Sequence, residues 1–142
     1  MKIRIKRFDP SLPLPAYQTP GAVAFDLSAR VSTEIPSHAV VMVPLNVAIK
    51  PPEGHMLFLA PRSSLHKRGL MFANSVGIGD EDFCGDTDEY KAALYNFTDK
   101  VTIVEKGERV AQGMFIRVTK GEWEEVKHMD VSSRGGFGST GK

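Results

Sequence analysis

The last nine residues of the chain, 134–142, carry groups that together can bind an anion. They include four glycines, whose backbone N–H groups have no side-chain cover, and a cation at each end. Ser139 and Thr140 add hydroxyl groups, so that amides, hydroxyls and a guanidinium could surround a phosphate. Phe137 adds a flat apolar face on which a nucleobase could stack. These residue types indicate a tail that closes over a nucleotide, although a plain flexible terminus has a similar composition.

A turn rich in carboxylates, 77–86, is the second segment whose residues could do chemistry. It contains three glycines, a cluster of acidic side chains and one aromatic residue, Phe83, and we expect a hairpin there. Carboxylates close to phosphates would repel them unless they hold a metal ion or accept a proton from water. The alternative is a solvent-exposed acidic turn without a catalytic role.

Two shorter segments add cations and polar groups. Pro61–Leu65 joins an expected strand to a short helical turn, where helix N–H groups favour anions and Arg62 adds a cation. Lys106–Gln112 leads from a turn into another strand. Each has a simpler interpretation, which is a capped helix with a surface arginine in the first case and a core strand with a satisfied amide in the second. Neither segment predicts a function by itself.

The overall composition is that of one soluble globular domain. A chain of 142 residues, of which 42% are hydrophobic and 25% charged, can bury a core of its own. The net charge of +1 provides no basic field for a nucleic acid and no polybasic patch for a membrane surface. No apolar run approaches the ~20 residues that span a bilayer. A lone cysteine, Cys84, excludes an intrachain disulfide and fits a reducing, cytoplasmic compartment.

The secondary-structure signals are those of many short strands. Alternating or apolar runs predict strands at residues 2–6, 40–49, 55–60, 90–97, 109–118 and 123–126. The one predicted helix is short, at residues 63–68, and Gly69 ends it. Short strands with almost no helix indicate an all-β sandwich or jelly roll. We expect a β domain over residues 1–131 and a glycine-rich tail over residues 132–142.

Taken together and in order, these segments resemble the five motifs of the homotrimeric dUTPase family. The matching segments are Ala24–Ala29, Arg62–Leu70, Asn74–Asp86, Gly107–Gln112 and the tail. The resemblance covers nearly the whole chain. It implies an all-β, jelly-roll-like fold with one short helix and a flexible C-terminal tail, and it implies a homotrimer with its active sites at subunit interfaces.

The resemblance also implies an activity. Members of the family hydrolyse dUTP to dUMP and pyrophosphate with Mg²⁺, by attack of water on the α-phosphate. This reaction keeps uracil out of DNA and supplies dUMP for thymidylate synthesis, in the cytoplasm or, for a viral protein, in the equivalent compartment of the host cell. The expected partners are therefore dUTP and other copies of this chain, with no nucleic acid and no membrane.

Carried over residue by residue, the resemblance assigns roles to individual side chains. Asp80 matches the carboxylate that activates the attacking water, and Ser63 matches the serine near the bridging oxygen where leaving-group charge develops. Asp26 matches the carboxylate that holds Mg²⁺ through water. The residues matched to substrate binding are Arg62, Ser64, Asn74, Gly77, Phe83, Gln112, Arg134, Phe137, Gly138, Ser139 and Thr140.

By the same resemblance, the third motif reads the nucleoside. Its hairpin would pair main-chain groups with uracil, and the ring of Phe83, where the family usually has tyrosine, would leave no space for a 2′-hydroxyl. The chain departs from the family pattern at Gly79, which replaces an aliphatic residue, and in extra residues at 87–90. The spacing between Arg134 and Phe137 is also shorter than usual.

Two other functions remain open from the sequence. dCTP deaminases share the fold but carry a catalytic glutamate in the strand after the third motif, where Ala92–Asn96 contains none. A non-catalytic trimer that binds a nucleotide or a partner protein would be expected to lack Asp26, Asp80 or the tail, and all three are present.

Overall fold

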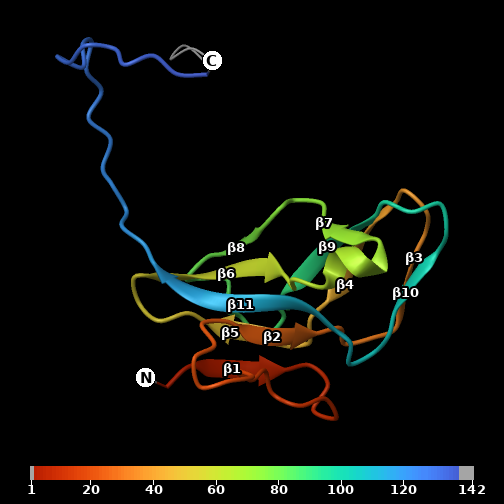
Figure 1. The fold of residues 1–142 in the computed structure, drawn as a ribbon. Helices are drawn as coiled ribbons and strands as arrows, with labels where there is room; N and C mark the ends of the chain where they lie inside the picture. Colours follow the sequence, from red (N-terminus) through yellow and green to blue (C-terminus); the bar gives the residue numbers. More distant parts are fainter. Residues whose placement is uncertain (1, 138–142) are drawn as a thin grey trace.

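The computed structural model describes residues 2–137, which form an almost entirely β structure (Figure 1). The elements in chain order are β1 (Arg4–Arg7), β2 (Phe25–Ser28), β3 (Thr33–Ile35), β4 (Val40–Pro44), β5 (Val47–Lys50), β6 (His55–Pro61), the 3-10 helix η1 (Leu65–Arg68), β7 (Leu70–Phe72), β8 (Gly77–Gly79), β9 (Lys91–Asn96), β10 (Thr102–Val104) and β11 (Arg109–Arg117). The all-β class and the short helical turn expected from the sequence are confirmed. Within these residues no helix is long and apolar enough to cross a membrane.

The strands pair antiparallel in two larger sheets and two additional pairs. One sheet has the order β2-β11-β6-β8 and the other the order β4-β9-β7, while β1 pairs with β5 and β3 with β10. One hydrophobic cluster draws on both larger sheets, with Leu27 and Leu57 from the first and Val43 and Leu94 from the second. The sheets therefore enclose a common core, as in other β-sandwich and jelly-roll domains.

Strand β2 shows how the sequence pattern directs side chains. Phe25 and Leu27 are buried in the core, and Asp26 and Ser28 between and after them are only partly buried. Successive side chains of a strand point to opposite faces of its sheet. The apolar residues of β2 therefore anchor it to the core, and Asp26 is directed to the outer face of the four-stranded sheet.

Two strand predictions differ from the structure. The predicted strand at 40–49 is divided into β4 and β5, because the buried residue Asn46 has a left-handed backbone (φ 69°) that bends the chain. The predicted strand at 123–126 is wrong, since the chain after Arg117 leaves the sheets as an extended segment (Figure 1). Trp123 is fully exposed there, and within residues 2–137 no strand pairs with this segment.

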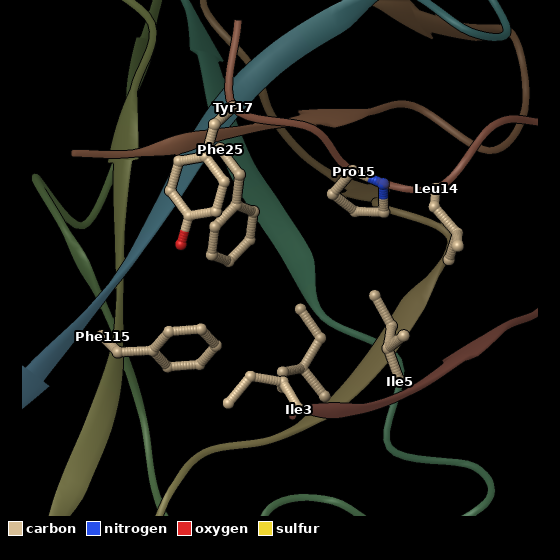
Figure 2. Close-up of a pocket in the computed structure, with 8 residues that line it drawn as sticks. Ile3, Ile5, Leu14, Pro15, Tyr17, Phe25 and Phe115 are labelled. Carbon is tan, nitrogen blue, oxygen red and sulfur yellow. The ribbon is translucent and has the colours of Figure 1, made fainter. Parts of the chain in front are cut away.

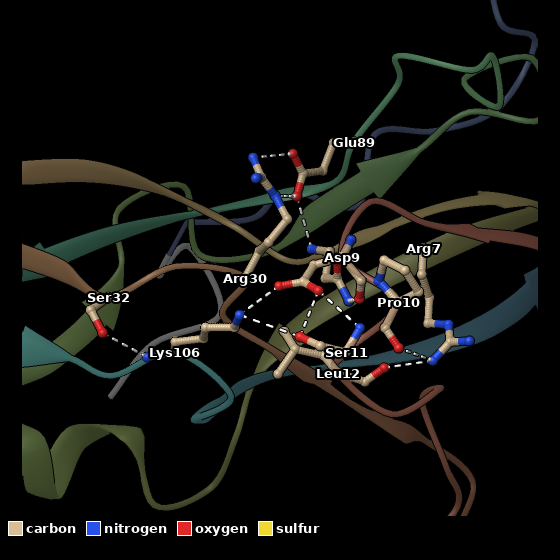
Figure 3. A network of polar contacts seen from close by, with 10 residues as sticks. Arg7, Asp9, Pro10, Ser11, Leu12, Arg30, Ser32, Glu89 and Lys106 are labelled. Atoms are coloured by element: carbon tan, nitrogen blue, oxygen red, sulfur yellow. Dashed lines mark hydrogen bonds and ion pairs between the residues drawn. The ribbon is translucent and has the colours of Figure 1, made fainter.

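A polar network ties the N-terminal segment to the rest of the domain (Figure 3). The carboxylate of Asp9 is 2.6 Å from the Lys106 ammonium and accepts hydrogen bonds from the backbone and side chain of Ser11. Lys106 and then Ser11 hold the pKa of Asp9 well below its usual range. In the same view Arg30 donates two hydrogen bonds, of 2.8 and 3.0 Å, to Glu89. Paired charges thus connect loops that lie far apart in the sequence.

Asn96 at the end of β9 is a fully buried polar side chain with every polar atom satisfied. Its Nδ2 donates to the carbonyl oxygens of Ile35, at 2.9 Å, and Lys100, at 2.7 Å. Its Oδ1 accepts from the backbone N–H and the hydroxyl of Thr98, at 2.9 and 2.8 Å. A single amide thus closes the 97–100 turn and joins it to β3.

We expect Asn96→Ala to lower the free energy of unfolding by about 2–4 kcal/mol, because it leaves several buried polar groups without partners. Urea unfolding at one protein concentration measures this difference. Asn74→Ala, which truncates an exposed asparagine, is the matched control and should change stability little. Equal effects of the two substitutions would contradict the structural role of Asn96.

Candidate active site

The first group of candidate residues surrounds the carboxylate of Asp26. The Nε atom of Arg62 donates to Asp26 Oδ1 and the Nη1 atom of Arg109 donates to Oδ2, both at 2.9 Å. Asp26 is largely buried and the two arginines are more exposed, with side-chain exposures of 12%, 29% and 44%. One carboxylate therefore orients two guanidinium groups whose outer edges face solvent, which is the arrangement of an anion-binding surface.

Strand pairing explains why these residues meet. Gln112 in the central strand β11 lies opposite Asp26 of β2 on one side and opposite Ala60 of β6 on the other. Its Nε2 donates to the carbonyl oxygen of Pro61, at 2.9 Å, at the point where β6 ends and Arg62 follows. The register of three neighbouring strands thus brings Asp26, Gln112 and Arg62 close together.

Ser63 and Ser64 lie beside this group, in the turn that follows Arg62. Both are exposed, and Ser64 precedes η1 without using its hydroxyl as a helix cap. The turn is held by the buried side chain of Leu65 and ends at Gly69, whose φ of 72° favours glycine. The backbone packing of this turn therefore leaves the two serine hydroxyls available for a ligand.

The second group lines a hollow of about 450 Å³ beside β8. Asn74, Gly77, Asp80 and Phe83 all contribute to its wall. A Cβ atom at Gly77 would lie 3.0 Å from the Cβ of Leu59, so glycine lets β8 approach β6 closely. Asp80 and Phe83 are exposed at this hollow. The hairpin predicted here is not found among the described residues, because β8 pairs with β6 and not with a strand across the turn. The loop after β8 nevertheless forms a recess with an acid and an aromatic ring.

The two groups do not meet within one chain. Strands β2 and β8 are opposite edges of the four-stranded sheet, so Asp26 and Asp80 are three strand spacings apart, about 14 Å. Asp26 is aligned across the sheet with Ala60 of β6. Gly79, just before Asp80, pairs with Leu57 of the same strand. This offset of about four residues adds roughly 13 Å along the strands, and the total separation is about 20 Å.

Comparison with known proteins identifies the family. The sequence profile of the family described as dUTPase matches residues 11–141. The deoxyuridine 5'-triphosphate nucleotidohydrolase of Wolinella succinogenes is 39% identical over 145 residues, which cover 100% of this chain and 95% of that protein. The protein of the same name from Helicobacter pylori (strain P12) is 38% identical, with 99% and 97% covered.

The chain belongs to the dUTPase family.

Solved dUTPase structures have the same fold. The dUTPase from Streptococcus mutans superposes with a TM-score of 0.76 at 32% identity, over 84% of this chain and 98% of that one. The dUTPase of Staphylococcus bacteriophage 80alpha, solved with dUPNHPP, superposes with a TM-score of 0.86 at 19% identity, over 99% of each chain. The jelly-roll-like dUTPase fold predicted from the motifs is therefore confirmed.

The described part of the tail of this dUTPase, up to Phe137, lies away from both groups. Arg134 and Phe137 are exposed near the end of the segment that leaves the sheets (Figure 1). Gly138, Ser139 and Thr140 lie outside the described residues. Strand β11 already ends at Arg117, so the extended segment begins well before residue 132, where the sequence analysis placed the start of the tail.

An apolar hollow elsewhere in the dUTPase contains none of the candidate residues (Figure 2). It measures about 180 Å³, and its walls include Ile5, Leu14, Phe25 and Phe115. Apart from the hydroxyl of Tyr17, the labelled side chains in Figure 2 offer only carbon to this space. The hollow therefore lacks the polar groups that a nucleotide triphosphate requires.

Asp26 is suited to hold Mg²⁺ through water rather than by direct coordination. Within residues 2–137 no three His, Cys, Asp or Glu side chains gather as a metal cage. Each oxygen of Asp26 accepts one arginine N–H and keeps a second lone pair for another donor, such as a metal-bound water. Mg²⁺ retains several waters and binds substrate phosphates, so one outer carboxylate fits its chemistry.

Arg109 is a site residue that the sequence analysis did not single out. In a regular strand, Arg109 and Gln112 are three residues apart and would point to opposite faces of the sheet. A bulge between Arg109 and Ala111 places Arg109 opposite Ser28, which shares the face of Asp26. The position of Arg109 within the fourth motif could have marked it in the sequence. The bulge, however, is what turns its side chain toward Asp26.

Proposed function

We propose that this dUTPase hydrolyses dUTP to dUMP and pyrophosphate in an active site assembled from more than one chain. The observation that carries the proposal is the recess beside β8, because a carboxylate, an aromatic ring and a glycine-lined backbone edge share one wall. The family match over residues 11–141 and the names of the relatives support the same substrate.

In this proposal Asp80 is the general base. Its exposed carboxylate accepts a proton from a water molecule as the water oxygen attacks the α-phosphorus. The bond between that phosphorus and the α–β bridging oxygen breaks, and pyrophosphate leaves with the bonding electron pair. The Ser63 hydroxyl and the Arg62 guanidinium donate hydrogen bonds to this oxygen and to the phosphates as negative charge develops. Mg²⁺, when bound to the phosphates, neutralises charge there, and Asp26 would hold its water ligands.

The recess reads the nucleoside through shape and backbone polarity. The edge of β8 that faces away from β6 offers main-chain groups to uracil, because β8 is the last strand of its sheet. The ring of Phe83 lies under the deoxyribose and excludes a 2′-hydroxyl by steric contact. Asn74 at the preceding turn adds a polar group to the same wall.

The separation of the two residue groups supports a homotrimer with shared sites. An Asp80 about 20 Å from the Asp26 of the same chain is too far away to act on a phosphate chain held there. A neighbouring copy can supply the missing half, and the tail, which extends away from its own sheets, can close over a site of another subunit. The reaction would keep uracil out of DNA and supply dUMP in the cytoplasm, or in the host cell for a viral protein.

The substrate assignment is tested by pyrophosphate release from dUTP, dCTP, dTTP and UTP. We expect dUTP to be turned over with a much higher kcat/KM than the other three, and EDTA to suppress the reaction. Ammonia release from dCTP would instead indicate the deaminase, which strand β9 does not support because Ala92–Asn96 lacks a glutamate. Tight dUTP binding without turnover would indicate a nucleotide-binding trimer.

Asp80→Asn should keep the fold and nucleotide binding and lower kcat by about 10²–10⁴-fold, because the amide cannot accept the proton of water. The matched control is Asp82→Asn, which makes the same change two residues away in the same exposed turn. Single-turnover kinetics with dUTP separate the chemical step from binding. Near-normal kcat in Asp80→Asn would contradict its role as the base and point to Asp82.

Shared sites predict that two inactive variants restore each other. When Asp26→Asn and Asp80→Asn chains are refolded together in equal amounts, about a quarter of the sites should combine wild-type groups from different chains. Activity near a quarter of wild type is therefore expected, whereas each variant alone stays inactive. Light scattering should give three times the chain mass of 15.6 kDa. Mixtures that stay inactive although mixed trimers form would contradict the shared site.

Deleting every residue after Val131 should leave the trimer and its melting temperature nearly unchanged, because the described part of the removed segment is exposed. Turnover of dUTP should fall by orders of magnitude, since closure excludes water and completes the set of phosphate donors. Phe137→Ala should be a milder form of this defect and Phe137→Trp should be tolerated. A truncated enzyme as fast as the full chain would show that the tail is a plain terminus.

A further inference from the structure

The buried side chain of Tyr90 contacts the turn that carries Asp80 and Phe83. Its hydroxyl donates a hydrogen bond to the backbone carbonyl oxygen of Phe83 at 3.3 Å. Its ring meets the Phe83 ring edge-to-face, with centroids 5.2 Å apart and planes at 76°. Tyr90 therefore restrains both the main chain and the side chain of the residue to which we assign sugar recognition.

Gly79 provides the space that the Tyr90 ring occupies. A Cβ atom at Gly79 would lie 2.5 Å from Tyr90 Oη and 2.7 Å from Cε1, both too close for real contacts, and 3.0 Å from Cζ. Gly79 does not have a positive φ angle, so its backbone conformation does not demand glycine. The missing side chain at position 79 and the large one at position 90 are thus complementary in volume.

The backbone of Tyr90 is held firmly by the core. Its N–H donates to the carbonyl oxygen of Val47 and its carbonyl oxygen accepts from the N–H of Leu45, both at 2.9 Å. Burial raises the pKa of Tyr90 to about 12, with smaller contributions from Cys84 and Asp80. The phenol therefore remains a neutral hydrogen-bond donor at the pH at which the enzyme works. Because its backbone is bonded to Leu45 and Val47 of the core and its hydroxyl to Phe83, Tyr90 restrains the exposed turn.

We propose that Tyr90 is a positioning residue that sets the discrimination between deoxyribose and ribose in this pocket. Tyr90 lines the same hollow as Asp80 and Phe83, and by its hydrogen bond and ring contact it holds the Phe83 ring at one depth and tilt. A ring that is free to move would admit a 2′-hydroxyl. The inference rests on the proposed function, since that proposal places the sugar against Phe83.

The first test removes only the hydroxyl. Tyr90→Phe should lower the ratio of kcat/KM for dUTP to that for UTP by about 3- to 10-fold, the effect expected from losing one hydrogen bond. The matched control is Tyr95→Phe in β9, the strand that begins directly after Tyr90. The Tyr95 hydroxyl lies 3.3 Å from the Nδ1 atom of the exposed His38, and Tyr95 does not line the hollow. Merely lower stability would reduce both rates alike and leave the ratio unchanged.

The second test uses the volume match with position 79. Gly79→Ala should displace the turn and lower the same ratio. In a Tyr90→Val background, which already lacks the ring, Gly79→Ala should lower the ratio little further, whereas in a Tyr90→Phe background it should still lower the ratio, because Cε1 would lie 2.7 Å from the new Cβ. A Gly79→Ala effect that disappears with valine but persists with phenylalanine at position 90 is a result that a general loss of stability does not produce.

The outcomes separate this inference from the proposed function. No turnover of dUTP by the wild-type enzyme would overturn the function itself. Wild-type turnover with an unchanged dUTP to UTP ratio in both Tyr90→Phe and Gly79→Ala would overturn the role of Tyr90 alone. If Tyr90→Phe does not fold, the Gly79→Ala comparison decides, and an effect of Gly79→Ala that is equally large with tyrosine and with valine at position 90 would reject the inference.

Discussion

Strand β11 is paired with β2 on one side and with β6 on the other. The positions of the candidate residues around Asp26 depend on this double pairing. The strands approach closely because β11 has glycine at its centre, since a Cβ at Gly113 would lie 2.8 Å from the Phe25 ring and 3.2 Å from Leu57. In this register Gln112 lies beside Asp26, and Arg62, which follows the end of β6, reaches the same carboxylate. A shift by one residue would send these polar side chains into the core.

The four-stranded sheet that brings the candidate residues around Asp26 together also holds the recess beside β8 away from them. β8 is hydrogen-bonded to β6 on the opposite side from β11, so the loop that follows β8 begins at the edge of the sheet farthest from Asp26. In the proposed function, a single chain therefore holds two parts of the site that lie about 20 Å apart. Oligomerisation is then a chemical requirement of the proposed activity rather than only a contribution to stability.

The recess also shows how a departure from the family pattern can be compensated. Gly79 would loosen an isolated hairpin, because glycine has the most backbone freedom. Here the Tyr90 ring fills the space beside Gly79, and the Tyr90 hydroxyl donates a hydrogen bond to the Phe83 carbonyl oxygen. The neighbouring Glu89 adds to this support, since it pairs with Arg30 and accepts the N–H of Asn46 at 2.9 Å. The extra residues at 87–90 are thus anchored to the core and form part of the pocket wall.

The sequence by itself determined the fold class, the family and a short helical turn, predicted at 63–68 and found at 65–68, because these follow from local alternation, turn residues and the order of the motifs. The recess residues were also predictable, since Asn74, Gly77, Asp80 and Phe83 are near one another in the chain. Only the tertiary structure decided which distant groups meet. A bulge turns Arg109 toward Asp26, and the Tyr90 ring lies in the space beside Gly79. Both depend on strand register and side-chain volume, which local sequence patterns do not encode.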